Sequence, residues 1–203
     1  MRSRILDAAD RLLAREGFRR MTVETVAREA GIAKGSVYLH FDSKEDVALS
    51  CIDRMAAGVV ARLERIAVGD GPAPARLRAM LRERVLLRFD YARHHAPSID
   101  EKLAVMRQAM LDRRATHFDE EAAVLARTIE RGRDEGAFAC ASPARAARAL
   151  VTATNALLPY SLSVRELGAR APLARRLDDL VTLLLAGLTR PAAKPSRTRR
   201  NTP

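Results

Sequence analysis

Residues 22–41, TVETVAREAGIAKGSVYLHF, have the pattern of two short helices joined by a glycine turn. The side chain of Thr22 can cap the first helix by accepting a hydrogen bond from the amide of Glu24 or Thr25. Gly31 can adopt the left-handed conformation that ends this helix. Two helices in this arrangement can read DNA, so the pattern favours a binding protein over an enzyme.

The second helix, predicted to have about two turns, separates an inward face from an exposed one. Ile32 and Val37 can pack inward. The other side chains are left on the remaining faces: Lys34, Ser36, Tyr38 and His40. This exposed set suits a major groove, although spacing alone also allows an ordinary helical hairpin with a solvated polar face.

From residue 5 to residue 49 the chain, ILDAADRLLAREGFRRMTVETVAREAGIAKGSVYLHFDSKEDVAL, resembles the TetR family of bacterial transcriptional regulators. The likeness includes the aliphatic first helix, the EGF exit at residues 16–18, the Thr22 cap, the KGSVYLHF helix and the SKED start that follows. The resemblance implies that Phe41 anchors the recognition helix in the core. It places these residues at the DNA surface: Thr22, Lys34, Gly35, Ser36, Tyr38, His40 and Lys44. Ala33 departs from the family, which often has a capping Ser or Thr there, and the loss is about 1 kcal/mol.

The residues of this surface divide by chemistry into two groups. Cationic, hydroxyl and amide groups suit phosphates, which fix the register on DNA without reading its sequence. These groups belong to Thr22, Lys34, Gly35, His40 and Lys44. Short or flat side chains can approach base edges, and these are Ser36, Val37 and Tyr38.

Composition indicates a helical protein. The 203 residues are 48% apolar and 4% aromatic, with no Trp. We expect an all-α fold of about nine helices, with a three-helix helix-turn-helix DNA-binding domain at residues 1–46 and a helical ligand-binding and dimerisation domain at residues 47–189. Residues 190–203 carry five of the eleven net positive charges and lack apolar periodicity, which predicts a disordered basic tail. Such a tail either touches phosphates nonspecifically or is solvated without a function.

Other function classes lack their sequence signals. No GxSxG, P-loop, HExxH or paired CxxC motif is present, so we expect no enzyme, no metal and no cofactor. The adjacent His94 and His95 would point about 100° apart on a helix, which prevents them from sharing a metal easily. The chain has no apolar run of 18 residues and no signal peptide, which predicts a cytoplasmic protein without a membrane partner.

The pattern beyond residue 43 predicts further helices. Ser43 and Asp46 have capping-box spacing at the start of a long helix, which residues 69–74 interrupt with Gly and Pro. A second long helix runs to His94 and His95.

Ser98 and Glu101 have the same capping-box spacing and would begin a short third helix. A further helix ends in GRDEGAF at residues 132–138, and Ser142 with Pro143 would begin the next as cap and first residue.

The last two helices are strongly apolar, and the final one has leucines around more of its circumference than a single neighbour requires. The family resemblance implies that these two helices pair with their copies in a homodimer. The interface residues expected are Leu150, Leu157, Leu177, Leu180, Val181, Leu184 and Leu188. Burial of the same leucines within one subunit is the alternative.

The family also binds a small-molecule effector in a cavity of the C-terminal domain. Polar, aromatic and flexible residues on the helices around such a cavity form the mixed lining typical of small-molecule sites. The candidates are Arg62, Phe89, Arg93, His94, Met106, Met110, His117, Asn155 and Tyr160. Each also has a structural or solvated alternative, core packing for the two methionines above all.

These observations together predict a ligand-responsive transcriptional regulator. By the family's usual mode it would act as a repressor, bind a palindromic double-stranded DNA operator as a homodimer and be released by a small molecule. The alternative is an architectural or sequence-insensitive DNA-binding protein without effector control, for which a basic tail and a helix-turn-helix also suffice.

Overall fold

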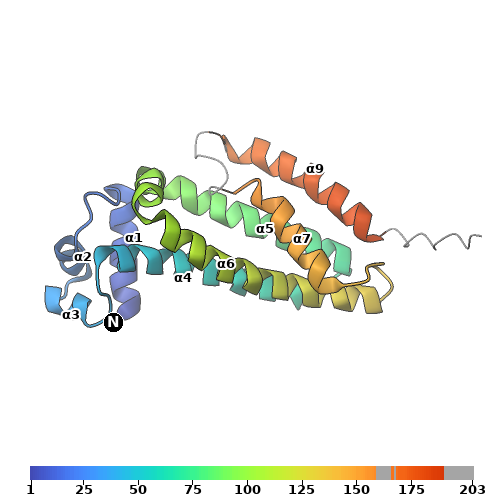
Figure 1. The fold of residues 1–203 in the computed structure, drawn as a ribbon, viewed down its shortest axis with the longest axis horizontal. Helices are drawn as coiled ribbons and strands as arrows, with labels where there is room; N and C mark the ends of the chain where they lie inside the picture. The colour runs from blue at the N-terminus through green and yellow to red at the C-terminus, as the bar shows by residue number, and fades with distance from the viewer. Residues whose placement is uncertain (159–165, 167, 190–203) are drawn as a thin grey trace, which may run out of the picture.

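The computed structural model describes residues 1–158, 166 and 168–189, and gives the backbone alone for residues 97–104. The residues described form eight α-helices and no strand, which confirms the all-α prediction. The helices are α1 (Arg2–Arg15), α2 (Val23–Ala30), α3 (Lys34–Tyr38), α4 (Lys44–Ala67), α5 (Ala73–His94), α6 (Ala96–Asp134), α7 (Pro143–Asn155) and α9 (Arg170–Thr189). In Figure 1, α1, α2 and α3 gather at one end of an elongated molecule, and α4, α5 and α6 run away from them.

Three helices begin at the capping residues that the sequence predicts. Thr22 accepts a hydrogen bond from the amide of Thr25 at 3.1 Å, Ser43 from that of Asp46 at 3.1 Å, and Ser142 from that of Arg145 at 3.3 Å. Each side chain satisfies an amide that the first helical turn leaves without a partner. These helix starts therefore follow from local chemistry.

The helix α3 is shorter than the two turns expected. It ends at Tyr38, and Ala33 at its N-cap makes no side-chain hydrogen bond. Beyond Tyr38 the chain tightens, since the His40 amide bonds to the Val37 carbonyl, three residues back, at 2.9 Å. A helix without a side-chain cap has little to extend it beyond the turn that packing holds in place.

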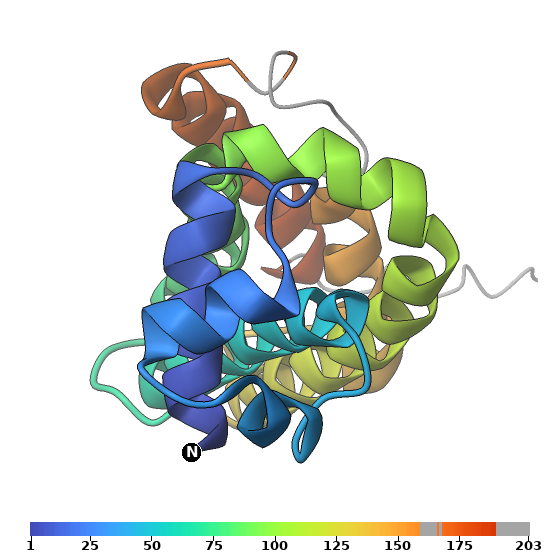
Figure 2. The same ribbon diagram turned by 90° about the vertical axis from the view of Figure 1, so that its left-hand side faces the viewer.

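The N-terminal core is built from α1, α2, α3, the start of α4 and two methionines of α6. Phe18, Val26, Val37 and Phe41 are all buried in it. Figure 2, seen from this end, shows α1, α2 and α3 in front of the long helices. The two-helix unit is thus fixed to α1 and α4 by apolar packing, which makes α3 a rigid support for its outer side chains.

The helix α6 differs from the prediction of two separate helices. It runs from Ala96 to Asp134, with a kink at Met106, whose backbone leaves the helical region (φ −120°, ψ 21°). Pro97 lies in the first turn, where its missing amide costs nothing, so the helix begins before Ser98, the start that capping-box spacing predicted.

The larger core lies among the second half of α4, α5, the second half of α6, α7 and α9. Gly132 allows α6 to pack closely against the ring of Phe138, because a Cβ at residue 132 would lie 2.5 Å from two carbons of that ring. The Ala139 amide then bonds to the Leu188 carbonyl of α9 at 2.8 Å.

In the part of the chain that the structure describes, no helix is long and apolar enough to cross a membrane.

Candidate DNA-binding surface and effector site

The end of α3 carries an exposed aromatic residue, and an exposed aliphatic residue follows it at the C-cap. Tyr38 is 49% exposed and Leu39 is 82% exposed. Lys34, Gly35 and His40 are also exposed, while Ser36 is half-buried. The sequence reasoning missed Leu39, whose apolar side chain suits the methyl group of thymine. The signal in the sequence is a leucine directly after Tyr38, outside the inward positions of the helix.

Val37 is wrongly predicted to approach base edges. Its side chain is fully buried in the N-terminal core, together with Phe41. The correction follows from helix geometry, because Val37 lies on the face of α3 opposite to the exposed residues. Phe41 is confirmed as an anchor of this segment, and the ring of Phe41 also lies under the guanidinium of Arg2 at 4.5 Å.

The positive charge of Lys34 has an internal partner. Its ammonium group forms an ion pair with Glu24 of α2, across the turn between the two helices. The hydrogen bond between them raises the pKa of Lys34 and lowers that of Glu24. Because both groups are exposed, the pair contributes little to stability and is screened by salt. A DNA phosphate would compete with Glu24 for this ammonium group.

Two other predicted phosphate contacts also have internal partners. The hydroxyl of Thr22 is part of a capping box with Thr25. The Lys44 ammonium lies 3.4 Å from the Phe18 carbonyl and 4.5 Å from the centroid of the Phe18 ring. A phosphate contact from Lys44 therefore requires that its side chain turn away from Phe18.

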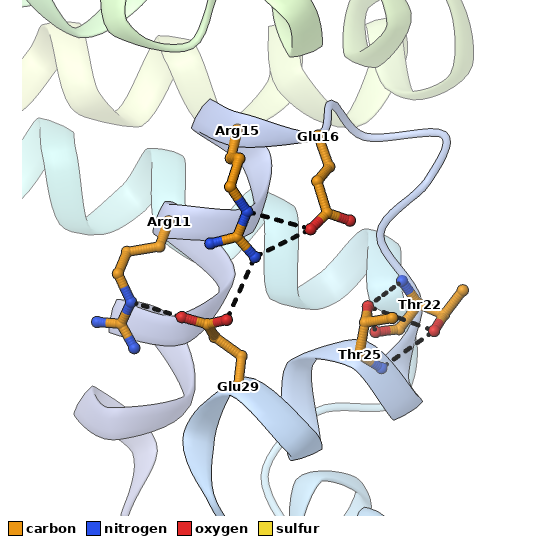
Figure 3. A network of polar contacts seen from close by, with 6 residues as sticks. All are labelled: Arg11, Arg15, Glu16, Thr22, Thr25 and Glu29. Carbon is orange, nitrogen blue, oxygen red and sulfur yellow. Dashed lines mark hydrogen bonds and ion pairs between the residues drawn. The ribbon is translucent and has the colours of Figure 1, made fainter.

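An ionic network attaches α2 to α1, as Figure 3 shows. Glu29 of α2 accepts hydrogen bonds from Arg11 at 2.9 Å and from Arg15 at 3.3 Å, and Arg15 also bonds to Glu16. The hydrogen bond from Arg11, followed by that from Arg15, lowers the pKa of the Glu29 carboxyl. This network fixes the orientation of α2, and with it that of the turn to α3.

Polar contacts also join the N-terminal helices to the rest of the molecule. Arg113 of α6 lies 3.7 Å from Asp46, at the start of α4, and it also pairs with Asp53 further along α4, as does His117 at 3.1 Å. His95, at the end of α5, has its Nε2 atom 3.2 Å from Asp10 of α1, although without hydrogen-bond geometry. The three-helix unit is thus linked to both α5 and α6, so a movement of either helix would act on it.

Among the grooves that described residues line, the predicted effector residues are spread over three. Arg62 and His94 line an open groove of about 640 Å³ between α4 and α5, which Asp10 also borders. His117 and Asn155 line two other grooves, of about 330 Å³ and 190 Å³. Arg93 is exposed.

Three of the remaining candidates belong to the cores, and one cannot be placed. Met106 and Met110 are buried in the N-terminal core, where α6 packs on α1, and Phe89 is buried in the larger core. In this structure their side chains take part in apolar packing, and their role as ligand lining stays a prediction. Tyr160 lies outside the described residues.

Sequence reasoning also missed a buried polar cluster. Arg84 and Arg88 of α5 both pair with Glu121 of α6 inside the larger core. Arg84 further donates to Thr154 at 2.6 Å and to Asn155 at 2.5 Å, both on α7. The spacing of Arg84 and Arg88, four residues apart beside the apolar positions of α5, is the signal that could have shown a shared inward face.

The expected dimer residues face two ways. Leu150, Leu157, Leu177 and Val181 are buried in the larger core of a single chain, so their assignment to an interface is corrected. Three others, Leu180, Leu184 and Leu188, are partly buried at its edge. Leu183, which was not predicted, is 74% exposed. The sequence of a leucine-rich helix does not show which face is inward, since apolar residues occur all round it.

The two cysteines are free thiols, with Cys51 buried and Cys140 half-buried. Among the residues described, no three His, Cys, Asp or Glu side chains are grouped to hold a metal ion.

Comparison with known proteins matches both parts of the chain. Residues 5–51 match the model of bacterial regulatory proteins of the tetR family, and residues 73–181 match that of the tetracyclin repressor-like C-terminal domain. The fatty acid metabolism regulator protein of Bacillus subtilis is 35% identical over 60 residues, which are 30% of this chain and 31% of that protein. The chain spans about a third of the length of such curated relatives in these matches.

Solved structures share the whole fold. A TetR-family regulator from Mesorhizobium loti superposes with a TM-score of 0.73 at 21% identity, over 93% of this chain and 96% of that one. The regulator FadR from Bacillus subtilis, solved in complex with stearoyl-CoA, gives 0.65 at 19% identity, over 93% and 100% of the two chains. The helix-turn-helix, the C-terminal helices and the two family matches agree: this chain belongs to the TetR family of bacterial regulatory proteins.

Proposed function

We propose that the protein is a transcriptional regulator that binds a palindromic DNA operator as a homodimer and is released from it by a small molecule. The observation that carries the proposal is the exposed surface of α3 and of the turn that follows it, with Lys34 and Tyr38 on the helix and Leu39 and His40 in the turn. This surface is held by buried Val37 behind it, so its side chains are presented to DNA on a rigid support.

The dimer would form through the outer face of α9. Exposed Leu183, with Leu180, Leu184 and Leu188 at the edge of the core, makes an apolar strip that a second copy would cover. Two copies related by a twofold axis would place their α3 helices in successive major grooves, about 34–36 Å apart.

Effector binding would act through the polar contacts at the joint between the domains. A ligand that shifts α5 or α6 would disturb the contact of His95 with Asp10, or that of Arg113 with Asp46. Because α1 and α4 hold the three-helix unit, the spacing of the two α3 helices would change, and affinity for the operator would fall. Repression is the family's usual outcome, and the DNA target implies a cytoplasmic, non-enzymatic protein.

The test is binding of the purified protein to DNA from its own upstream intergenic region and to a scrambled duplex, at physiological salt, with a footprint of the bound region. We expect a palindromic footprint and affinity at least about 1000-fold above that for the scramble. Equal binding to the two duplexes at every salt concentration would favour the architectural alternative.

Two variants separate base reading from phosphate contact. Tyr38→Ala should reduce the preference for the operator more than nonspecific affinity, because Tyr38 is exposed at the centre of the α3 face. Lys44→Ala should lower the affinity for both duplexes alike and reduce the salt slope by about one. Equal losses on both duplexes for Tyr38→Ala would contradict this division of roles.

A further inference from the structure

Two guanidinium groups share one carboxylate inside the C-terminal domain. The side chains of Arg84, Arg88 and Glu121 are 0%, 2% and 0% exposed, respectively. Arg84 Nε lies 2.5 Å from one oxygen of Glu121, and Arg88 pairs with the other oxygen. Both carboxylate oxygens are therefore already occupied, and the group of three carries a net charge of +1.

The neighbouring side chains do not balance this charge. The ring of Phe118 faces the guanidinium of Arg84 at 4.9 Å and that of Arg88 at 5.6 Å, and Arg114, another cation, lies over the same ring at 5.7 Å. Among residues whose side chains the structure describes, Glu121 is the one buried carboxylate. Burial lowers the pKa of Arg84 to about 10, which still leaves it charged at neutral pH.

A neutral amide occupies the position where an anion would be favourable. Arg84 Nη2 donates to Asn155 Oδ1 at 2.5 Å, and Nη1 donates to the Thr154 hydroxyl at 2.6 Å. Asn155 is half-buried and also lines the open groove of about 190 Å³ between α6 and α7. Its side chain thus lies between the buried guanidinium and the groove.

We propose that this groove binds the carboxylate group of an organic acid, which displaces the Asn155 amide and pairs with Arg84. A carboxylate has the planar shape of the amide, accepts two hydrogen bonds from a guanidinium, and makes bonds about twice as strong as neutral ones. Phe118, Ala122 and Val151 supply the apolar wall for the rest of the acid. The same groove is bordered by Asp119 and Arg148, two exposed side chains that pair with each other at 4.0 Å. This acid would be the effector of the regulator. Only that assignment rests on the proposed function; the binding of the acid does not.

The first test installs a carboxylate at the position that the ligand would take. Asn155→Asp keeps the side-chain shape and adds the missing charge, so the Tm should rise by at least about 2 °C, the shift that 1 kcal/mol produces in a chain of this length. Asn155 is the last residue of α7, where the helix dipole disfavours a negative charge. A rise in Tm would therefore occur in spite of the dipole. Thr152→Asp is the matched control, since Thr152 lines the same groove one turn earlier. It should lower the Tm or leave it unchanged.

The second test compares acids with neutral amides of the same shape. Benzoate and hexanoate should raise the Tm of the unaltered protein in proportion to RT ln(1 + [L]/Kd). Benzamide and hexanamide, added at the same ionic strength and protein concentration, should not raise it. Asn155→Asp should abolish the response, because its own carboxylate would occupy Arg84.

Three results would overturn the inference: an unchanged or lower Tm for Asn155→Asp, equal shifts with acids and amides, or no shift with either acid. Neither test involves DNA. Failure of the anion site would therefore leave operator binding intact, and failure of operator binding would leave these Tm measurements unaffected.

Discussion

Gly132 of α6 provides a stability prediction whose sign depends on tertiary packing. A Cβ at this position would lie 2.5 Å from two ring carbons of Phe138 and 2.7 Å from the Cβ of Ala73. Carbon atoms normally approach to about 3.5–4.0 Å, so Gly132→Ala would require shifts of about 1 Å in two directions. Overpacking of this kind costs about 1–3 kcal/mol, and three simultaneous overlaps place the cost near the upper value.

A gain from helix propensity opposes this cost. Replacing glycine by alanine inside a helix contributes about 1 kcal/mol, so the net loss for Gly132→Ala is about 2 kcal/mol, or about 4–8 °C in Tm. Gly58, inside α4, is the matched control, because a Cβ there meets nothing within 4 Å. Gly58→Ala should gain about 1 kcal/mol, or about 2–4 °C.

Thermal unfolding followed by circular dichroism, at one protein concentration, measures both variants. Urea unfolding gives the corresponding free energies if the slope m is the same as in the unaltered protein. A Tm for Gly132→Ala at or above that of the unaltered protein would refute the reasoning, since it would mean that Phe138 and Ala73 move aside without cost.

Three further predictions concern the DNA-binding end. Ala33→Ser should cap α3 and raise stability by about 1 kcal/mol, measured as a Tm rise of about 2–4 °C; no rise would show that the α3 start cannot accept a cap. Gly35→Ala should not lower the Tm, because its Cβ meets nothing within 4 Å, yet it should lower DNA affinity at least about tenfold by obstructing the backbone amide; unchanged affinity would place Gly35 away from DNA. Glu29, whose pKa is lowered in the folded state by Arg11 and Arg15, stabilises the fold above its unfolded pKa and loses this effect as the pH falls through its folded pKa. The Tm advantage over Glu29→Gln should therefore be present at pH 7 and decline only once the pH falls below the unfolded pKa of glutamate, about 4.3, and an advantage independent of pH would contradict the ion-pair explanation.

The helix-turn-helix was predicted well because its signals are local. A hydroxyl at residue 22 and a left-handed glycine at residue 31, with φ of 63°, each act on backbone groups a few residues away. Such bonds need no knowledge of the rest of the chain. The predicted length of α3 was too great, because the apolar spacing that suggested two turns continues to Phe41. The local signal of a capping side chain is missing, since Ala33 supplies no cap.

The sequence could not divide the effector candidates between core and groove, because their surroundings depend on distant partners. Met106 and Met110 had the spacing of a ligand-lining face or of a core, and the kink of α6 directs them into the N-terminal core. Composition cannot show which helix an apolar side chain meets, since the hydrophobic effect has no direction of its own.

The sequence by itself thus determined the helical class, the helix starts at Thr22, Ser43 and Ser142, and the family to which the chain belongs. Tertiary structure alone decided that Leu177 and Val181 face inward while Leu183 faces outward, because α9 is apolar on more than one side. It also decided the grouping of the Arg84 cluster, for which α5, α6 and α7 had to meet before two arginines could share one carboxylate. Hydrogen bonds between neighbours in sequence are available to any chain that contains the right residues, whereas burial and charge pairing exist only after the helices have packed.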